Sequence, residues 1–297
     1  MSSEASLAMT VVRSGEESVS GASVEWYSMT EEPIDYEVGW GAARIQSNIT
    51  SAKLDELRQT YNIPPYVKLL VPDAHERACF PRPNCVAFSE HLLKAGVRLP
   101  LHPFFRAVLR TFMLSPTQIL PNGWSQVVGT YFLWKEVSLG EDLPLHVFES
   151  LFHARVVGKD DSKGWYYITP WGSHAPFVVG LPSSIKGWKE SWFWVTGRWQ
   201  MVEGDAVPAV TVPTQYYEAC ECLKFLQLHY FPSDADSCSC IADCSTRYEL
   251  SEAEWAIIED IYQRSPRLRS FSHLIERSRY FIDFGLMAPK GKRRFHL

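Results

Sequence analysis

The hydrophobic residues between positions 89 and 200 change their spacing partway along the segment. Short strand-like runs occupy residues 152–157 and 165–168, with further candidates at 177–179 and 192–195. Before them, hydrophobic residues recur every three or four positions, as on one face of an α-helix. The two clearest such stripes are Phe104, Phe105, Val108, Leu109 and Phe112, and then Trp124, Val127, Val128, Tyr131 and Trp134. Separate blocks of helices and strands predict an α+β fold, with a helical block packed on a small antiparallel sheet.

Local signals indicate further helices on both sides of these stripes. Residues 51–61 have helical spacing and precede a short strand expected at 67–71, and a proline-rich loop leads to a helix that begins at Ser89. Downstream, residues 215–228 and 251–263 are expected to be helical, the latter with a capping box. These last two segments predict a C-terminal helical appendage.

Gly129 lies inside the second hydrophobic stripe. Glycine costs a helix about 1 kcal/mol relative to alanine, so its presence predicts close helix packing at this point. Eight tryptophans lie between Trp124 and Trp199, and we expect them to be mainly core residues.

Charge is distributed unevenly along the chain. Residues 1–60 hold ten acidic against four basic residues, whereas residues 264–297 hold nine basic against two acidic ones. The start of the chain is also poor in large hydrophobic residues, which predicts disorder. The expected organisation is a disordered acidic leader (1–47), a folded domain (48–200), a helical region (201–285) and a basic tail (286–297).

Several protein classes are disfavoured by composition. The N-terminus has no signal-peptide pattern, and no apolar run approaches the roughly 20 residues that a membrane-spanning helix needs. Seven irregularly spaced cysteines do not form a disulfide framework and favour a reducing compartment, the nucleus or the cytoplasm. A net charge of −5 argues against binding nucleic acid over the whole surface, so any such contact is expected to be local.

Five short motifs follow one another in an order that resembles a known plant family. They are YNIP at 61–64, AGVRLPLHPF at 95–104, QILPNGW at 118–124, the strand pair with LF at 151–152 and GWYY at 164–167, and LPSSIKGWK at 181–189. Together they resemble the putative gypsy-type transposon domain over about residues 48–200. Val97 and Leu99 depart conservatively from the Leu and Phe that are typical of the family. The resemblance implies a gag-like structural or assembly role and carries over no catalytic residue.

Compact enzyme signatures are missing from the sequence. It contains no aspartic-protease, reverse-transcriptase, phosphate-loop, zinc-protease or nucleophile-elbow motif. An integrase-type acidic triad would be assembled by folding and is not excluded by this search, but Asp160 and Asp161 fall in an expected turn. We therefore expect a protein that is not an enzyme and needs no cofactor.

The C-terminal third contains the best metal-binding candidates. Thiolates with an imidazole from His229 could hold tetrahedral zinc. The CxC spacing is tighter than a usual zinc knuckle, so free thiols are the favoured interpretation and no metal is predicted. The cysteines concerned are Cys220, Cys222, Cys238, Cys240 and Cys244.

Two segments are candidates for nucleic-acid contact. In the first, Lys186 and Lys189 precede Trp192 and Trp194, a combination that could stack on single-stranded bases if it were exposed. Such a strand is more often part of a sheet core. The second is the tail, whose side chains could contact phosphates or an import receptor; they are Lys290, Lys292, Arg293 and Arg294.

These observations lead to one main functional hypothesis and two alternatives. The main hypothesis is a gag-like structural or protein-interaction module with a protein partner or self-association, and with local nucleic-acid contact through the tail. The first alternative is a DNA-binding protein derived from a transposase. The second is a transposon-related hydrolase or nuclease, for which no cluster of acidic residues can be named. No membrane partner or small-molecule substrate is expected.

Overall fold

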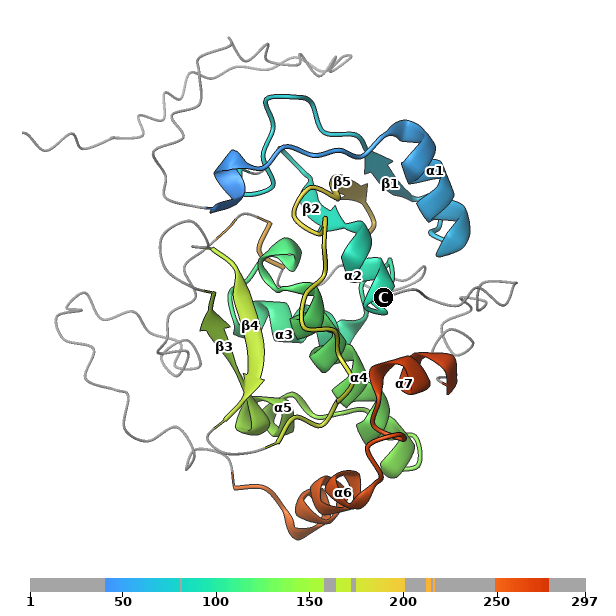
Figure 1. Cartoon of the computed structure of the whole chain (residues 1–297), viewed down its shortest axis with the longest axis vertical. Helices are drawn as coiled ribbons and strands as arrows, with labels where there is room; N and C mark the ends of the chain where they lie inside the picture. Colours follow the sequence, from blue (N-terminus) through green and yellow to red (C-terminus); the bar gives the residue numbers. More distant parts are fainter. Residues whose placement is uncertain are drawn as a thin grey trace, which may run out of the picture. The chain divides into compact units, whose positions relative to one another are not determined.

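A computed structural model describes residues 41–80, 82–157, 164–171, 175–200, 212–214, 216 and 249–277. All of them belong to the unit Tyr36–Leu297. They form an α+β structure, as predicted, in which helices pack around two small antiparallel sheets (Figure 1). The helix expected at 215–228 lies outside the described residues except for Tyr216.

The larger sheet contains three strands from distant parts of the sequence. Its order is β1 (Val67–Leu70), β5 (Trp192–Gly197) and β2 (Val86–Ser89), and both pairs are antiparallel. Side chains alternate between two buried faces, as strand geometry requires. Phe88 and Phe193 join the main core, whereas Trp192 and Trp194 pack in a second cluster with Trp165.

The smaller sheet contains β3 (Phe152–Val156) and β4 (Tyr166–Pro170), close to the predicted strand pair. The expected strands are therefore divided between two sheets, not gathered in one. The strand predicted at 177–179 is wrong: Val179 forms only an isolated bridge with Ser270. Its neighbour Val178 is buried against helix α4 (Pro121–Val137), so hydrophobic contact and not strand pairing explains this apolar run.

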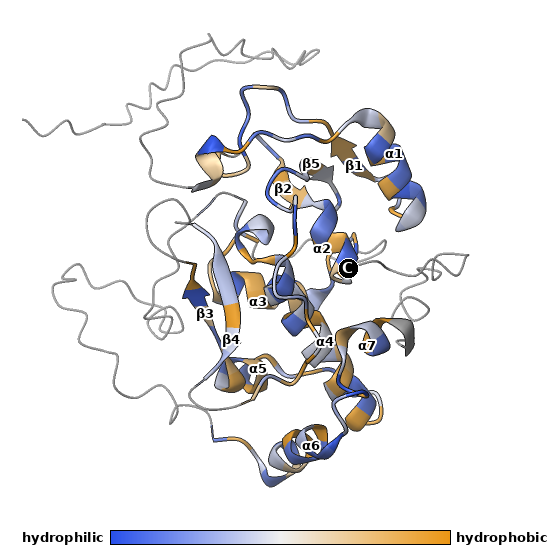
Figure 2. Cartoon of the chain, in the orientation of Figure 1, coloured by the Kyte–Doolittle hydropathy of each residue, from blue (hydrophilic) through white to orange (hydrophobic). Residues whose placement is uncertain are grey.

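Helix α4 lies at the centre of the described structure. It contacts β4 and the two C-terminal helices, and most of its residues are buried (Figure 1). Hydrophobic and hydrophilic residues alternate along the outer helices, which therefore turn one side to the core (Figure 2). The remaining helices are α1 (Ser51–Thr60), α2 (Glu90–Lys94), α3 (Pro103–Thr111), α5 (Leu145–Leu151), α6 (Glu252–Gln263) and α7 (Phe271–Arg277), with 3₁₀ turns at Gly41–Arg44 and Pro116–Gln118.

Helix α6 begins with the predicted capping box. Ser251 Oγ accepts the backbone N–H of Glu254, and the Glu254 carboxylate accepts the N–H of Ser251 at 2.8 Å. The same carboxylate lies 2.7 Å from His146 Nε2 on α5. One glutamate thus completes the cap of α6 and ties this helix to the core.

Gly129 marks a close contact, as the sequence predicted. A Cβ atom built on it would lie 2.5 Å from Val178 Cγ2, well inside van der Waals contact. We expect Gly129→Ala to lower the free energy of unfolding by about 1–2 kcal/mol, because overpacking outweighs the gain in helix propensity. Urea denaturation of both proteins measures the difference.

The Val178→Ala change supplies the control for this prediction. In a Val178→Ala background the clashing methyl groups are gone, so the methyl group that Gly129→Ala adds should be neutral or stabilising. The double-mutant cycle should therefore give a coupling energy of about 1 kcal/mol or more. Additive effects of the two substitutions would contradict the close-contact explanation.

Candidate binding site

The segment that precedes β5 divides into exposed and buried residues. Lys186 is exposed and Lys189 is half-buried. Trp192 and Trp194 are only 2% and 0% exposed, and their rings meet edge to face with centroids 5.1 Å apart. Base stacking needs an open ring face. The stacking role considered for these two tryptophans is therefore wrong, and the alternative interpretation as sheet core is correct.

A small pocket lies beside this buried pair, and we call it the indole pocket. Its cavity volume is about 10 Å³, enough for the centre of one water-sized group. Residues from several distant segments meet here: the 3₁₀ turn near residue 42, the end of β2, the loop before β4 and the segment before β5. The lining residues are Ala42, Ile45, Ala78, Ser89, Leu92, Thr117, Ile119, Trp165, Trp188, Lys189, Trp192 and Tyr216.

Two indole rings and one ammonium group form part of the pocket wall. The rings of Trp165 and Trp188 meet edge to face with centroids 5.2 Å apart. Lys189 Nζ lies 4.4 Å from the centroid of Trp165 and 5.8 Å from that of Trp188. These distances are within the range of cation–π attraction. Lys189 is the one charged side chain among the lining residues, so the wall is aromatic and carries a positive charge.

Tyr216 closes the pocket on the side of the 3₁₀ turn Pro116–Gln118. Its hydroxyl donates to the backbone oxygen of Thr117 at 3.3 Å and lies 3.1 Å from Thr117 Oγ1. Burial raises the pKa of Tyr216 well above its usual range, which keeps the hydroxyl protonated and able to donate. This wall is therefore hydrogen-bonded in place.

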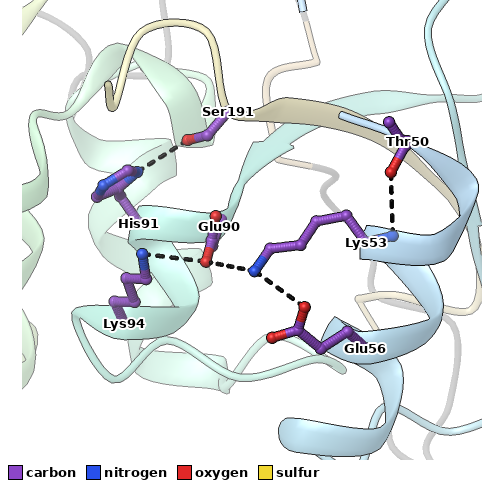
Figure 3. A network of polar contacts seen from close by, with 7 residues as sticks. All are labelled: Thr50, Lys53, Glu56, Glu90, His91, Lys94 and Ser191. Carbon is purple, nitrogen blue, oxygen red and sulfur yellow. Dashed lines mark hydrogen bonds and ion pairs between the residues drawn. The ribbon is translucent and has the colours of Figure 1, made fainter. Parts of the chain in front are cut away.

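A polar network adjoins the pocket at the start of α2 (Figure 3). Glu90 binds Lys53 of α1 at 3.1 Å and Lys94 of its own helix at 3.0 Å. Burial opposes ionisation of Glu90, but hydrogen bonds from Lys94 and Lys53 outweigh burial and lower its pKa. The network therefore holds α1 against α2 while Glu90 is ionised.

His91 and Ser191 form a second link in the same network. His91 Nδ1 lies 2.8 Å from Ser191 Oγ, and this hydroxyl donates to the backbone oxygen of Trp188 at 3.2 Å. Burial lowers the pKa of His91 to about 4, so the ring is neutral at pH 7. Because the Ser191 hydroxyl donates its proton to a backbone oxygen, it anchors the loop and holds Trp188 at the pocket wall.

We expect Glu90→Gln to lower the free energy of unfolding by about 1 kcal/mol, since two partly exposed ion pairs are lost together. Thermal or urea unfolding at low salt would show the effect, and it should shrink in 1 M NaCl. Glu56→Gln is the matched control, because Glu56 is 56% exposed and its one ion pair among the described residues is with Lys53. If both variants lowered the free energy of unfolding equally, the double ion pair of Glu90 would contribute no more than the single pair of Glu56.

The remaining sequence candidates stay untested. The tail residues Lys290, Lys292, Arg293 and Arg294 and the cysteines Cys220, Cys222, Cys238, Cys240 and Cys244 lie outside the described residues. Within the described ranges, no three His, Cys, Asp or Glu side chains gather as metal ligands. Cys79 and Cys85 are free and buried, and burial raises the pKa of Cys79 to about 12. Across the same ranges, no helix is both long and apolar enough to span a bilayer.

Comparison with known proteins supports the family resemblance over part of the chain. Residues 86–156 match the family model described as putative gypsy type transposon, which confirms the resemblance over β2, α2, α3, α4, α5 and β3. The motifs at 95–104, 118–124 and 151–152 fall inside this match, whereas those at 61–64, 164–167 and 181–189 fall outside it. Neither a curated protein nor a solved structure matches the chain.

The sequence did not reveal the indole pocket. It identified Lys189 and Trp192 as a conditional stacking surface or, more often, part of a sheet core, and it gave no role to Ser89 beyond a helix cap. Ser89 and Trp192 are opposite each other in the β2–β5 register. That pairing joins two distant segments, and β2 itself was not predicted because a short apolar run after a proline-rich loop carries no clear period.

Proposed function

We propose that this chain is a non-catalytic, transposon-derived module of gag-like type that acts through protein association in the nucleus or cytoplasm. The observation that supports this proposal most directly is the position of the family-matched segment 86–156 within the fold. This segment supplies the buried centre of the described structure, including α4. A family segment that mainly forms the buried core is typical of a protein that functions through binding surfaces on that core.

Polar side chains of the matched segment support this interpretation. Gln118 Nε2 donates to the Gly164 oxygen at 3.1 Å, and Gln126 Nε2 donates to the Val178 oxygen at 2.9 Å. Asn122 Nδ2 donates to the Pro182 oxygen at 2.7 Å. Each amide fixes a segment that lies outside the family match. These hydrogen bonds favour a structural role for the three side-chain amides. In an enzyme, such polar groups would instead be directed toward a substrate.

Light scattering coupled to size-exclusion chromatography tests self-association. We expect the apparent mass of the full chain to rise with concentration, or a specific partner to be recovered in a quantitative pull-down. Cell extract from the source tissue provides the partner pool, and a heat-unfolded sample of the same chain controls for nonspecific capture. A strictly monomeric chain that recovers no partner would count against the proposal.

DNA binding is the second candidate, and exposed basic residues favour it. Lys186 and Arg267 are exposed, and the basic tail follows Arg267 in the sequence. Other arginines of the same region have structural partners: Arg264 binds Glu136 at 2.5 Å, and Arg269 donates to the oxygen of Pro176.

A salt titration decides whether this second function exists. If the tail contacts phosphates, duplex DNA should bind with an affinity that falls steeply between 50 and 200 mM salt, by roughly tenfold or more. Neutralising Lys290, Lys292, Arg293 and Arg294 to Gln should abolish most of the binding, whereas Lys68→Gln serves as a control far from the tail in the sequence. A flat salt response would remove this candidate.

A further inference from the structure

The outer face of the small β3–β4 sheet differs from the side that faces the core. Residues alternate between the two sides of a strand. Phe152 and Ile168 belong to the main core, where both are buried. Arg155 and Tyr167 lie opposite each other in the register and are exposed, Tyr167 to 41%. The outer face therefore presents a cation beside an exposed aromatic ring.

Neither exposed side chain is bound within the described part of the chain. Arg155 forms no ion pair there, and no hydrogen bond or ring contact occupies Tyr167. Other arginines have structural contacts: Arg58 donates to the backbone oxygens of Ile63 and Pro64 at 3.0 and 2.9 Å. Arg155 has no such task, so its guanidinium can contact an anion from outside the chain.

The exposed ring lies in a longer row of aromatic residues along β4. Backbone hydrogen bonds from Val157 to Trp165 at 2.8 Å and from Trp171 to Leu151 at 2.9 Å extend the strand pairing at both ends. Alternation therefore places Trp165, Tyr167 and Trp171 on one side of the strand. The middle ring of this row is the exposed one.

Other side chains hold the two outer rings of the row in place. The Lys189 ammonium lies 4.4 Å from the centroid of Trp165. Trp171 stacks on His153 with centroids 4.1 Å apart, and its indole N–H donates to the backbone oxygen of Glu149 at 3.1 Å. The exposed Tyr167 ring is thus carried between two anchored neighbours, which favours a preformed binding surface.

Charge and ring chemistry together indicate the class of ligand. Strands β3 and β4 contain Arg155 and His153 but no acidic residue, and Lys189 adds a positive charge at the Trp165 end. The loop that joins the strands contains two lysines and two aspartates, so it does not change the balance. In a single-stranded nucleic acid, phosphates can pair with such cations while a base stacks on an exposed ring. A duplex keeps its bases stacked on one another and cannot offer the second contact.

We propose that the outer face of the β3–β4 sheet binds single-stranded nucleic acid, with a base stacked on Tyr167 and a phosphate paired with Arg155. The inference goes beyond the proposed protein association and does not depend on it. It also differs from the tail contact, because it requires unpaired bases and a folded sheet. Base stacking is thereby assigned to β4 and not to the buried Trp192 and Trp194.

Fluorescence anisotropy of labelled oligonucleotides tests this assignment on the full chain. The parent protein carries glutamine in place of Lys290, Lys292, Arg293 and Arg294, so that these tail side chains do not contribute. The first two probes are oligothymidine of about 12 nucleotides and an abasic strand of the same length, which has the phosphates without the bases. A duplex of equal length is the third probe. Oligouridine is the fourth, and it shows whether RNA is bound as well as DNA.

We expect oligothymidine or oligouridine to bind at least about tenfold more tightly than the abasic strand and the duplex at about 50 mM salt. Tyr167→Ala should weaken this binding at least about fivefold, whereas Tyr167→Phe should keep it within about twofold because the ring remains. Arg155→Gln should weaken binding of the abasic strand as well, since it removes a phosphate contact. Trp255→Ala is the matched control, because Trp255 is a similarly exposed aromatic (44%) on the acidic helix α6 and should change nothing.

Equal affinity for the abasic strand and the oligothymidine would overturn the proposal, as would binding of the duplex as tight as that of the single strand. Unchanged binding by a folded Tyr167→Ala or Arg155→Gln protein would also overturn it, and so would no binding up to about 100 µM protein. Urea denaturation shows whether each variant folds. Because Arg155 is exposed, Arg155→Gln keeps the test decisive if Tyr167→Ala does not fold. Light scattering and pull-down measure protein contacts, so failure there is distinguishable from failure here.

Discussion

Replacing Gly197 by alanine is expected to lower the free energy of unfolding by about 3 kcal/mol. Gly197 ends β5 with φ +81°, a backbone conformation that costs a side-chain-bearing residue about 1–2 kcal/mol. A Cβ atom built there would also lie 2.4 Å from the backbone oxygen of Tyr66. Because that oxygen belongs to the backbone beside β1, it cannot move aside without disturbing the strand pairing.

Gly187→Ala is the matched control for this substitution. Gly187 has φ +68°, but no heavy atom lies within 4 Å of the position that a Cβ atom would take. It therefore carries the conformational cost alone, and we expect a loss of about 1 kcal/mol. Urea denaturation at pH 7.5 measures both variants. If the two losses were equal, contact between the Cβ atom and Tyr66 would contribute nothing.

Acidification is expected to destabilise the protein through its buried histidines, chiefly His102. Burial lowers the pKa of His102 to about 4, from an ordinary value near 6.5. Its Nδ1 accepts the backbone N–H of Phe104 at 3.2 Å and thereby caps helix α3, which only an unprotonated nitrogen can do. The hydroxyl of Tyr131 lies 3.5 Å from the other ring nitrogen. The folded state thus favours the neutral ring.

The sign of the pH dependence follows from this shift. Between pH 6.5 and 4 the unfolded chain binds a proton at His102 that the folded protein does not, so stability falls as the pH falls. From pH 7.5 to pH 5 the contribution of His102 is a loss of about 2 kcal/mol. The lowered pKa of His91 acts in the same direction.

His102→Asn separates the titration from the cap. Asparagine caps helices well and does not titrate, so the variant should lose less stability than the parent between pH 7.5 and pH 5, by about 2 kcal/mol. His75→Asn is the control, because its exposed side chain changes environment little on unfolding. An unchanged pH dependence in the His102→Asn protein would show that His102 is not the responsible group.

Sequence analysis succeeded where structure is determined locally. The stripe from Trp124 to Trp134 predicted α4, and Ser251 with Glu254 predicted the start of α6, because helix periodicity and capping involve residues close in the chain. Gly129 was also interpreted correctly, since a glycine inside a helical stripe indicates close approach.

The parts that sequence did not predict depend on pairing between distant residues. The alternation of side chains along a strand predicted that Trp192 and Trp194 share one face. It could not show that both faces of this strand are buried in hydrophobic clusters. The apolar run that includes Val178 and Val179 suggested a strand, but contact with α4 decided its conformation. The indole pocket requires the register of Ser89 with Trp192, which no local pattern contains.

The order of strands in the larger sheet has a consequence for shortened copies of this gene. β5 pairs with both β1 and β2, although it is made more than a hundred residues after β2 begins. During synthesis, β1 and β2 are complete before their common partner β5 exists. Until β5 is made, the backbone N–H and C=O groups that would pair with it can pair with other chains. A stop codon before residue 192 would leave them permanently exposed, so such products should aggregate or be degraded, whereas truncation beyond residue 277 would spare the sheet entirely.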